Sequence, residues 1–322
     1  MKSKRMPVVV ITGASSGIGR ETSRRYAREG ARLVLASRSR AALETVAQEC
    51  RELGGQVLVV PTDVSDEGAV RALAAAAVSR FGRIDVWVNN AGVFAYGAFA
   101  DLPSDIFRQV VETNLMGQVH GARAVLPYFR AQHGGTLILV GSLYSRVGSP
   151  AITPYATSKF GLLGFAESLR PELRRTGIRL RLIVPGSVDT PVYQHAANVT
   201  GRLVRPLSPT TSPARVARAI VRAPRRRRFA TYIGRAQTAI LPVHDHAPRV
   251  FDALASWLMD HVELHGRNAE RSAGTVFAAP EEASPVTGGW RRTRLRVLVG
   301  VILTVTVLTA VRTTSRAVDV QP

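Results

Sequence analysis

TGASSGIG, residues 12–19, lies between a short apolar run and a segment with helical periodicity. The apolar run Val8–Thr12 predicts a buried strand, and the helix is expected to begin at residue 17. Glycines let the backbone approach a pyrophosphate closely, and the N–H groups and positive dipole end of the following helix can bind its charge. The sequence therefore predicts a dinucleotide-binding strand, loop and helix, with a tight turn that binds no ligand as the alternative.

The same alternation of apolar runs and helical patterns continues down the chain. Further strands are expected at Arg32–Ala36, Gln56–Val60, Ile84–Val88, Thr136–Gly141, Arg179–Val184 and Phe229–Ile233. Helices are expected near residues 17–29, 40–53, 66–80, 103–131, 154–175 and 213–222. Because parallel strands need crossover connections, this order predicts an α/β fold, a Rossmann-like doubly wound parallel seven-stranded sheet with helices on both faces, plus a C-terminal hydrophobic helix.

Composition divides the chain into three parts. We expect residues 1–265 to form a single Rossmann-type catalytic domain, with the cofactor half at about 1–135. Within it, the stretch 190–213 is rich in Thr, Pro and Gly and predicts a substrate loop, of which 190–205 would cover a site. Residues 266–290 are rich in Ala, Glu, Pro, Ser and Gly, which predicts a linker, and 291–322 form a basic-flanked hydrophobic tail.

Val297–Val311, within this tail, is an uncharged and mostly aliphatic stretch of fifteen residues with arginines on both sides. As a helix it would span about 22 Å, less than the roughly 30 Å hydrocarbon core of a bilayer. Snorkelling arginines, Leu295 and Trp290 could extend the span, so residues 295–312 are a candidate membrane anchor that would keep the catalytic domain on the cytoplasmic face. The alternative is a hydrophobic strand or helix that packs on a partner subunit.

Charge and cysteine content limit the classes of protein to which this chain can belong. The single cysteine, Cys50, excludes an intrachain disulfide framework, and the N-terminus lacks a secretory signal, which favours a cytoplasmic location. The net charge of +20 favours polyanions, whether nucleic acid, anionic lipid or a phosphorylated cofactor. No nucleic-acid motif is present, so no specific nucleic-acid partner is expected. The pairs His244/His246 and His261/His265 lack further ligands at metal spacing, so no metal is expected.

Further short motifs follow the glycine-rich loop in a fixed order. They are Asp63-Val64, NNAG at 89–92, Asn114, Ser142, YATSK at 155–159 and Pro185-Gly186. Together with the 12–19 loop, these motifs resemble the classical short-chain dehydrogenase/reductase (SDR) family over about residues 7–235. The resemblance implies a homo-oligomer and a cofactor site formed by Gly13, Ser15, Ser16, Gly17, Ile18, Gly19, Asp63, Val64, Asn90, Ala91, Gly92, Tyr155, Lys159, Val188 and Thr190.

The end of the second expected strand bears on the choice of cofactor. Ser37-Arg38-Ser39-Arg40 stands where an NAD enzyme is expected to carry an acid for the ribose 2′-hydroxyl. An acid there would repel a 2′-phosphate, whereas the guanidinium of Arg38 is suited to bind one. The sequence therefore favours NADP(H) over NAD(H). The NADP-dependent members of the family often also carry a basic residue where this chain has Ser16, and an exposed arginine without a ligand is the alternative for Arg38.

Tyr155 and Lys159 are four residues apart in an expected helix, so their side chains share one face. A phenol that acts as an acid/base near neutrality needs its pKa lowered by about three units, or roughly 4 kcal/mol. An ammonium about 4 Å away supplies roughly that much at an effective dielectric near 20. We therefore expect Lys159 to lower the pKa of Tyr155; the alternative is that both residues face solvent on an amphipathic helix.

The family resemblance adds two polar residues to this pair and gives each a role. Ser142 would hydrogen-bond the same substrate oxygen as Tyr155, and Asn114 would position a water bound to Lys159 in a proton relay. Lys159 would also bind the ribose hydroxyls of the nicotinamide. The four catalytic candidates are thus Asn114, Ser142, Tyr155 and Lys159.

The resulting hypothesis is an NAD(P)(H)-dependent oxidoreductase that interconverts a carbonyl and an alcohol, with Tyr155 as the acid/base and Ser142 and Tyr155 as substrate-binding residues. A hydrophobic small-molecule substrate is favoured by the apolar residues expected around the site, namely Phe94, Tyr96, Phe99, Tyr144, Val147 and Tyr193. The alternatives are a catalytically idle NADP-binding scaffold or sensor at a membrane surface and a basic nucleic-acid binder.

Overall fold

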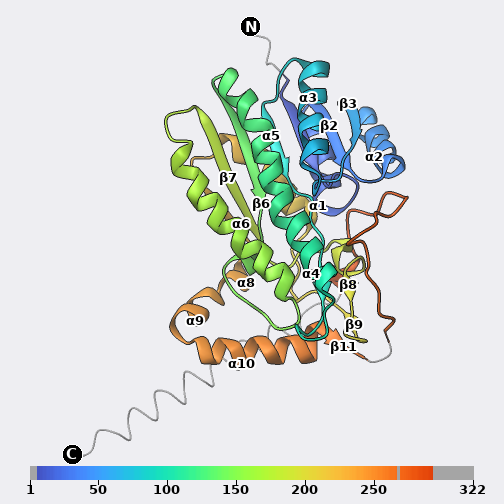
Figure 1. The fold of residues 1–322 in the computed structure, drawn as a ribbon, viewed down its shortest axis with the longest axis vertical. Coiled ribbons are helices and arrows are strands. Elements are labelled where there is room, and N and C mark those ends of the chain that lie inside the picture. The colour runs from blue at the N-terminus through green and yellow to red at the C-terminus, as the bar shows by residue number, and fades with distance from the viewer. Residues whose placement is uncertain (1–5, 267–268, 293–322) are drawn as a thin grey trace, which may run out of the picture.

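The computed structural model describes residues 6–266 and 269–292, which include a parallel seven-stranded sheet (Figure 1). Its strand order is β10-β7-β6-β4-β1-β2-β3. The strands are β1 (Val8–Thr12), β2 (Arg32–Ser37), β3 (Gln56–Pro61), β4 (Val86–Asn89), β6 (Gly135–Val140), β7 (Ile178–Pro185) and β10 (Ala230–Ile233). All seven predicted strands are therefore present, and the doubly wound fold predicted from the sequence is confirmed.

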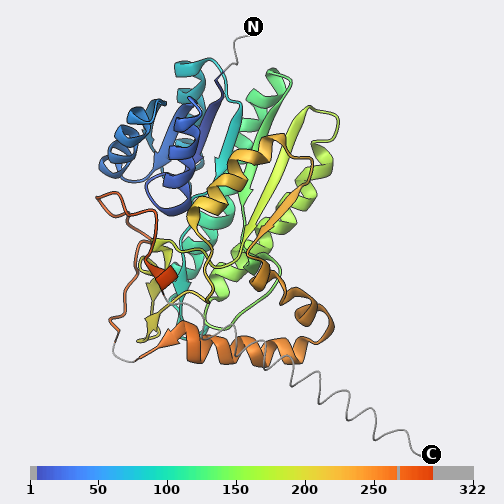
Figure 2. The same cartoon turned by 180° about the vertical axis from the view of Figure 1, so that it is seen from behind.

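Helices cover both faces of the sheet, as Figures 1 and 2 show from opposite sides. One face carries α3 (Glu67–Phe81), α5 (Gly117–Ala131) and α6 (Thr153–Glu172). The other carries α1 (Gly17–Arg28), α2 (Arg40–Glu52) and α7 (Pro213–Arg222). Each face has its own apolar cluster, which is why the strands are continuous apolar runs and not alternating ones.

A π-helical turn interrupts the long helix that was predicted over 103–131. The structure has α4 (Ser104–Val111), then the π turn η1 (Glu112–Met116), and then α5. Asn114 lies within this turn and is fully buried. Such π turns inside helices often occur at functional sites, where they redirect a side chain.

Smaller elements are attached beyond the carboxyl ends of the strands. β5 (Ala95–Tyr96) pairs with β8 (Ala197–Asn198), and β9 (Leu203–Val204) pairs antiparallel with β11 (Leu264–His265). The segment 190–205, predicted as a loop, thus contributes two strands and the short helix η3 (Pro191–Tyr193). The remaining helices are η2 (Leu143–Ser145), η4 (Ala223–Arg225), α8 (Arg235–Thr238), α9 (Leu241–His246), α10 (Pro248–Leu258), the π turn η5 (Met259–Glu263) and η6 (Trp290–Arg292).

Residues 269–292 pack along the catalytic domain, although their composition predicted a linker. Ser272 exchanges backbone hydrogen bonds with Asn198, and Thr275 N donates to His195 O at 2.8 Å. In Figures 1 and 2 this segment runs beside α2 and β8. We call residues 269–292 the C-terminal strap.

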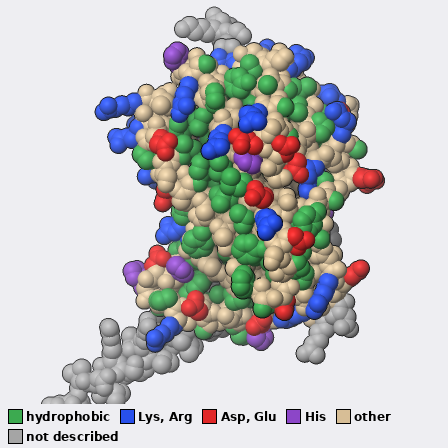
Figure 3. Space-filling model, viewed as in Figure 1, with side chains coloured by type: hydrophobic (Ala, Val, Ile, Leu, Met, Phe, Trp, Pro, Cys, Tyr) green, Lys and Arg blue, Asp and Glu red, His purple; other side chains and the backbone are tan. Residues whose placement is uncertain are grey.

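No helix in the described ranges is long and apolar enough to cross a membrane. The predicted hydrophobic helix and candidate anchor at 295–312 lie outside the described residues. On the face formed by α3, α5 and α6, acidic and basic side chains are interspersed among apolar ones (Figure 3). The positive charge of the chain is therefore not gathered into a single patch on that face.

Candidate active site

A cavity of about 350 Å³ opens at the carboxyl ends of the strands. This edge of an open parallel sheet is where ligands bind in α/β folds. The residues predicted for the cofactor converge on it, because all of them except Gly19 line the cavity: Gly13, Ser15, Ser16, Gly17, Ile18, Arg38, Asp63, Val64, Asn90, Ala91, Gly92, Tyr155, Lys159, Val188 and Thr190. Ser142 lines the same cavity, whereas Asn114 does not.

The glycine-rich loop passes very close to the start of α1. A Cβ atom on Gly19 would lie 2.0 Å from the carbonyl oxygen of Gly13, so no other residue fits there without a shift of the loop. Gly13 and Gly17 have φ angles of 64° and 48°, the left-handed region that disfavours residues with side chains. The loop is therefore shaped for close approach of its backbone to a ligand.

Two polar side chains fix this loop to the neighbouring strand end. The Thr12 hydroxyl accepts hydrogen bonds from the backbone N–H groups of Asn90 (3.0 Å) and Ala91 (3.1 Å). The Asn90 amide in turn donates to the carbonyl oxygens of Thr12 (3.0 Å) and Gly13 (3.2 Å). The ends of β1 and β4 are thereby locked together beside the loop.

Ser142, Tyr155 and Lys159 meet at the other end of the cavity. Ser142 follows β6 and accepts a hydrogen bond from Tyr144 N at 3.2 Å, and its hydroxyl lies near enough to Tyr155 to lower the pKa of the phenol. Tyr155 and Lys159 stand one turn apart on α6, which begins with Pro154 near its first position. The Lys159 ammonium donates to Val140 O at 3.1 Å and lies 5.5 Å from the centre of the Tyr155 ring.

The direction of the Tyr155 shift is opposite to the one predicted from the sequence. Burial raises the pKa of Tyr155 to about 12, and the hydrogen bond with Ser142 opposes this rise. Burial also lowers the pKa of Lys159 to about 8. Attraction between the two groups would favour their charged forms, but desolvation disfavours the charged form of each and is the larger effect here.

Asn114 holds the backbone beside the site and does not touch Lys159 through any hydrogen bond in the described structure. Its side chain accepts from Val93 N at 2.8 Å, and its amide donates to Val93 O at 2.9 Å and to Ser158 Oγ at 3.2 Å. The π turn therefore links the segment after β4 to α6. The water relay predicted for Asn114 stays a prediction.

The C-terminal strap contacts the cofactor end of the cavity. Arg38 donates to the carbonyl oxygens of Thr275 (2.6 Å), Val276 (3.1 Å) and Ala278 (3.3 Å). The N–H group of Gly17 donates to Pro285 O at 3.3 Å. Carbonyl oxygens of the strap thus lie on two of the groups that were predicted to bind phosphate.

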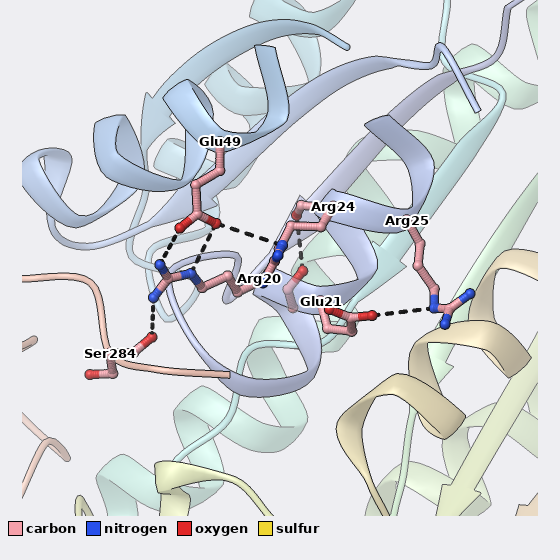
Figure 4. Close-up of polar contacts among 8 residues, drawn as sticks. Arg20, Glu21, Arg24, Arg25, Glu49 and Ser284 are labelled. Atoms are coloured by element: carbon pink, nitrogen blue, oxygen red, sulfur yellow. Dashed lines mark hydrogen bonds and ion pairs between the residues drawn. The ribbon is translucent and has the colours of Figure 1, made fainter. Parts of the chain in front are cut away.

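A second arginine attaches the strap to the domain. Arg20, on α1, forms an ion pair with Glu49 on α2 and donates through Nη1 to Ser284 O at 2.7 Å (Figure 4). The guanidinium thereby connects three segments that are far apart in the sequence. Sequence reasoning missed this contact because no periodicity or motif marks the strap.

Aromatic side chains form the substrate end of the cavity. Phe94 stacks on Tyr155 with ring centres 3.9 Å apart, and Tyr144 meets Tyr155 edge-on at 6.1 Å. Phe94, Tyr144, Val147 and Tyr193 line the cavity, as predicted. Neither Tyr96, which is buried, nor Phe99, which is 70% exposed, lines the cavity, so the prediction was wrong for both. Sequence reasoning also missed Glu263, a buried lining residue outside every motif.

Within the described ranges, no group of three or more His, Cys, Asp or Glu side chains could hold a metal ion. A glycine-lined cleft that leads to a buried serine and lysine and a partly buried tyrosine defines a dinucleotide-dependent oxidoreductase.

Comparisons with known proteins agree with this class. Residues 7–199 match the short chain dehydrogenase family. An uncharacterized oxidoreductase of Bacillus subtilis is 37% identical over 275 residues, which cover 84% of this chain and 76% of the relative. A dehydrogenase/reductase SDR family member 7B of Bos taurus is 36% identical, with coverage of 68% and 70%. The chain belongs to the short-chain dehydrogenase family and is an oxidoreductase.

Solved structures show the same fold with either nicotinamide dinucleotide. A short-chain dehydrogenase/reductase from Burkholderia phymatum in complex with NAD has a TM-score of 0.70 at 28% identity, covering 78% of this chain and 97% of that one. A variant of actinorhodin polyketide ketoreductase with NADPH has a TM-score of 0.63 at 33% identity, with coverage of 70% and 92%. The family therefore leaves the choice between the two cofactors open.

Replacing Gly19 by alanine tests whether the loop binds the dinucleotide. The added Cβ would collide with Gly13 O, so the Kd for NADPH in a fluorescence titration should rise about tenfold or more, each tenfold being about 1.4 kcal/mol. Gly164→Ala is the matched control, because Gly164 also lies in a helix and its Cβ would meet no atom within 4 Å. Equal Kd values for Gly19→Ala and the wild type would contradict a role of this loop in binding.

Proposed function

We propose that the protein is an NADP(H)-dependent oxidoreductase that interconverts a carbonyl and an alcohol on a largely apolar substrate, with Tyr155 as the acid/base. The observation that carries this proposal is that Ser142, Tyr155 and Lys159 line one cavity together with the glycine-rich loop. When bound, the nicotinamide would supply or accept the hydride. The chain itself would orient the substrate oxygen, exclude water and move one proton.

The residues that line the cavity fit a dinucleotide along its whole length. The N–H groups at the start of α1 suit a pyrophosphate, and the segment Asn90–Gly92 suits the middle of the cofactor. By analogy with the family, Asp63 and Val64 would hold the adenine, while Val188 and Thr190 would meet the carboxamide. Lys159 would bind the ribose hydroxyls next to the nicotinamide.

Burial strengthens the preference of Tyr155 for the neutral form, which an ordinary phenol already has at neutral pH. With a pKa of about 12, the phenol keeps its proton at neutral pH, as a donor to a substrate carbonyl must. Alcohol oxidation needs the phenolate instead. A neutral phenol suits the direction in which a carbonyl is reduced. The pKa of Lys159 is about 8, so its side chain is an ammonium at neutral pH. Its positive charge can stabilise the negative charge that develops on the phenol oxygen as the proton leaves.

Arg38 and the absence of an acid at the end of β2 support NADP(H) as the preferred cofactor. Arg38 lines the cavity and already donates to three carbonyl oxygens of the strap. A guanidinium has five N–H donors, and a phosphate dianion is a stronger acceptor than a backbone carbonyl. A 2′-phosphate could therefore share or replace these contacts.

Replacing Tyr155 by phenylalanine tests the assigned acid. The substitution removes only the hydroxyl, so NADPH binding should be retained while turnover of reducible carbonyls falls by about 10²- to 10⁴-fold, the usual contribution of general acid catalysis. The measurement is NADPH consumption with a panel of aldehydes and ketones, alongside the NADPH Kd. Unchanged turnover in Tyr155→Phe would remove the assigned acid. A wild type that binds NADPH but reduces no carbonyl would favour the idle scaffold.

Replacing Arg38 by alanine tests the cofactor preference. The Kd for NADPH should rise about 10- to 100-fold, because a hydrogen bond to a charged group contributes about 1.5–3 kcal/mol, and the Kd for NADH should change little. Arg40→Ala is the control, since Arg40 starts the neighbouring helix with a side chain that is 67% exposed and 4.0 Å from Glu44. An equal rise in both Kd values for Arg38→Ala would show that Arg38 only anchors the strap.

A further inference from the structure

Glu263 is a buried acid at the substrate end of the cavity. It is 4% exposed and lines the same cavity as Ser142 and Tyr155. It ends the π turn η5, and its carbonyl oxygen accepts a hydrogen bond from Arg205 N at 2.8 Å. The next residue, Leu264, pairs with Val204 in the small sheet formed by β9 and β11. The backbone of Glu263 is therefore held firmly on both sides.

Tyrosines surround this carboxyl group. Tyr144 donates from its hydroxyl to Glu263 Oε1 at 3.3 Å. The charge of Glu263 also acts on the phenols of Tyr96 and Tyr193, whose pKa values it helps to raise. Burial raises the pKa of Glu263 to about 7, with only the hydrogen bond from Tyr144 opposing the rise. No Lys, Arg or His of the described ranges forms an ion pair with it.

The carboxyl group of Glu263 can accept more hydrogen bonds than the described residues donate to it. A carboxylate offers about four acceptor positions on its two oxygens, and within the described structure one hydroxyl donates to one of those oxygens. Because Glu263 lines the cavity, a ligand with a donor group could use the remaining acceptor positions. If Glu263 served only to hold the Tyr144 hydroxyl in place, a neutral acceptor side chain would be sufficient.

Tyr144 connects Glu263 to the end of the cavity that holds Ser142 and Tyr155. Its hydroxyl contacts Glu263 while its ring meets Tyr155 edge-on with centres 6.1 Å apart. Phe94, Val147 and Tyr193 supply apolar lining to the same cavity. The cavity thus has a polar end at Ser142 and Tyr155, apolar walls and a second polar group one side chain away.

We propose that Glu263 is a specificity residue that binds a hydrogen-bond donor, a hydroxyl or an amine, on a substrate whose carbonyl lies against Ser142 and Tyr155. This inference rests on the proposed function and narrows its substrate class. The substrate has an apolar body with two polar ends: a reducible carbonyl and a distal donor. Sites built to pair a substrate donor discriminate strongly against the analogue that lacks it, because the site is then left with an unpaired polar group.

Matched pairs of ketones test this assignment. The probes are aliphatic methyl ketones of graded chain length, each compared with the same ketone carrying a terminal hydroxyl and with one carrying a terminal amine. At the best chain length, the wild type with NADPH should have a kcat/KM about tenfold or more higher for a donor-bearing ketone than for the plain one, a difference of about 1.4 kcal/mol. Comparing the hydroxyl and amine arms shows which donor the site takes.

Variants of Glu263 distinguish recognition of the substrate's donor group from a role that only holds Tyr144 in place. Glu263→Leu should lose the preference for donor-bearing ketones while keeping or improving its rate with plain ones. Glu263→Gln, which keeps an acceptor oxygen but no charge, should retain preference for the hydroxyl and lose it for the amine. Glu172→Gln changes an exposed acid on α6 and should behave as the wild type. An NADPH titration of each variant confirms that its cofactor site is intact.

The outcomes distinguish this inference from the proposed function. Equal kcat/KM values of the wild type for plain and donor-bearing ketones would overturn the role of Glu263 and leave the proposed function standing. If Glu263→Leu and Glu263→Gln lost kcat/KM equally for plain and donor-bearing ketones, Glu263 would only hold Tyr144 in place. That result would also overturn its role in substrate recognition. Failure of the wild type to reduce any ketone or aldehyde with NADPH would overturn both.

Discussion

Parallel pairing of β1, β4, β6 and β7 brings the ends of four strands to one edge of the sheet, and the whole site depends on that constraint. The glycine-rich loop leaves β1, the NNAG segment leaves β4, and Ser142 follows β6. The Thr12 hydroxyl and the Asn90 amide then lock the first two of these segments together. The sheet and its immediate hydrogen bonds therefore fix the position of the groups that line the cavity.

Desolvation is the second influence, because it shifts the pKa values of the ionisable groups in the site. Tyr155 is stacked against Phe94 and covered by Tyr144, so its phenol is held in the neutral form, while burial weakens the hold of Lys159 on its own proton. The same burial acts on Glu263 at the substrate end. Surroundings of low dielectric constant strengthen the electrostatic contacts made within them. The substrate that we propose would pair both of its polar ends and bury its apolar middle in these surroundings.

The sequence predicted the sheet and most of the site because these parts have local signatures. Strands buried on both faces are continuous apolar runs, and the loop at 12–19 and the pair Tyr155 and Lys159 have characteristic spacing. The π turn at 112–116, the strap over Arg38 and the acid at Glu263 were missed, since each depends on contacts between segments distant in sequence. The shift of Tyr155 was predicted in the wrong direction for the same reason: residues such as Phe94 bury it, and spacing does not reveal burial.

The central claim is that a nicotinamide dinucleotide lies in this cavity with its reactive ring against Ser142 and Tyr155. A crystal structure of the full chain with NADPH tests it most directly. The account predicts the pyrophosphate on the backbone of residues 13–19, the 2′-phosphate on Arg38, and the nicotinamide beside the Ser142 and Tyr155 hydroxyls. Electron density for the nucleotide elsewhere on the protein, or a nicotinamide directed away from Tyr155, would contradict it.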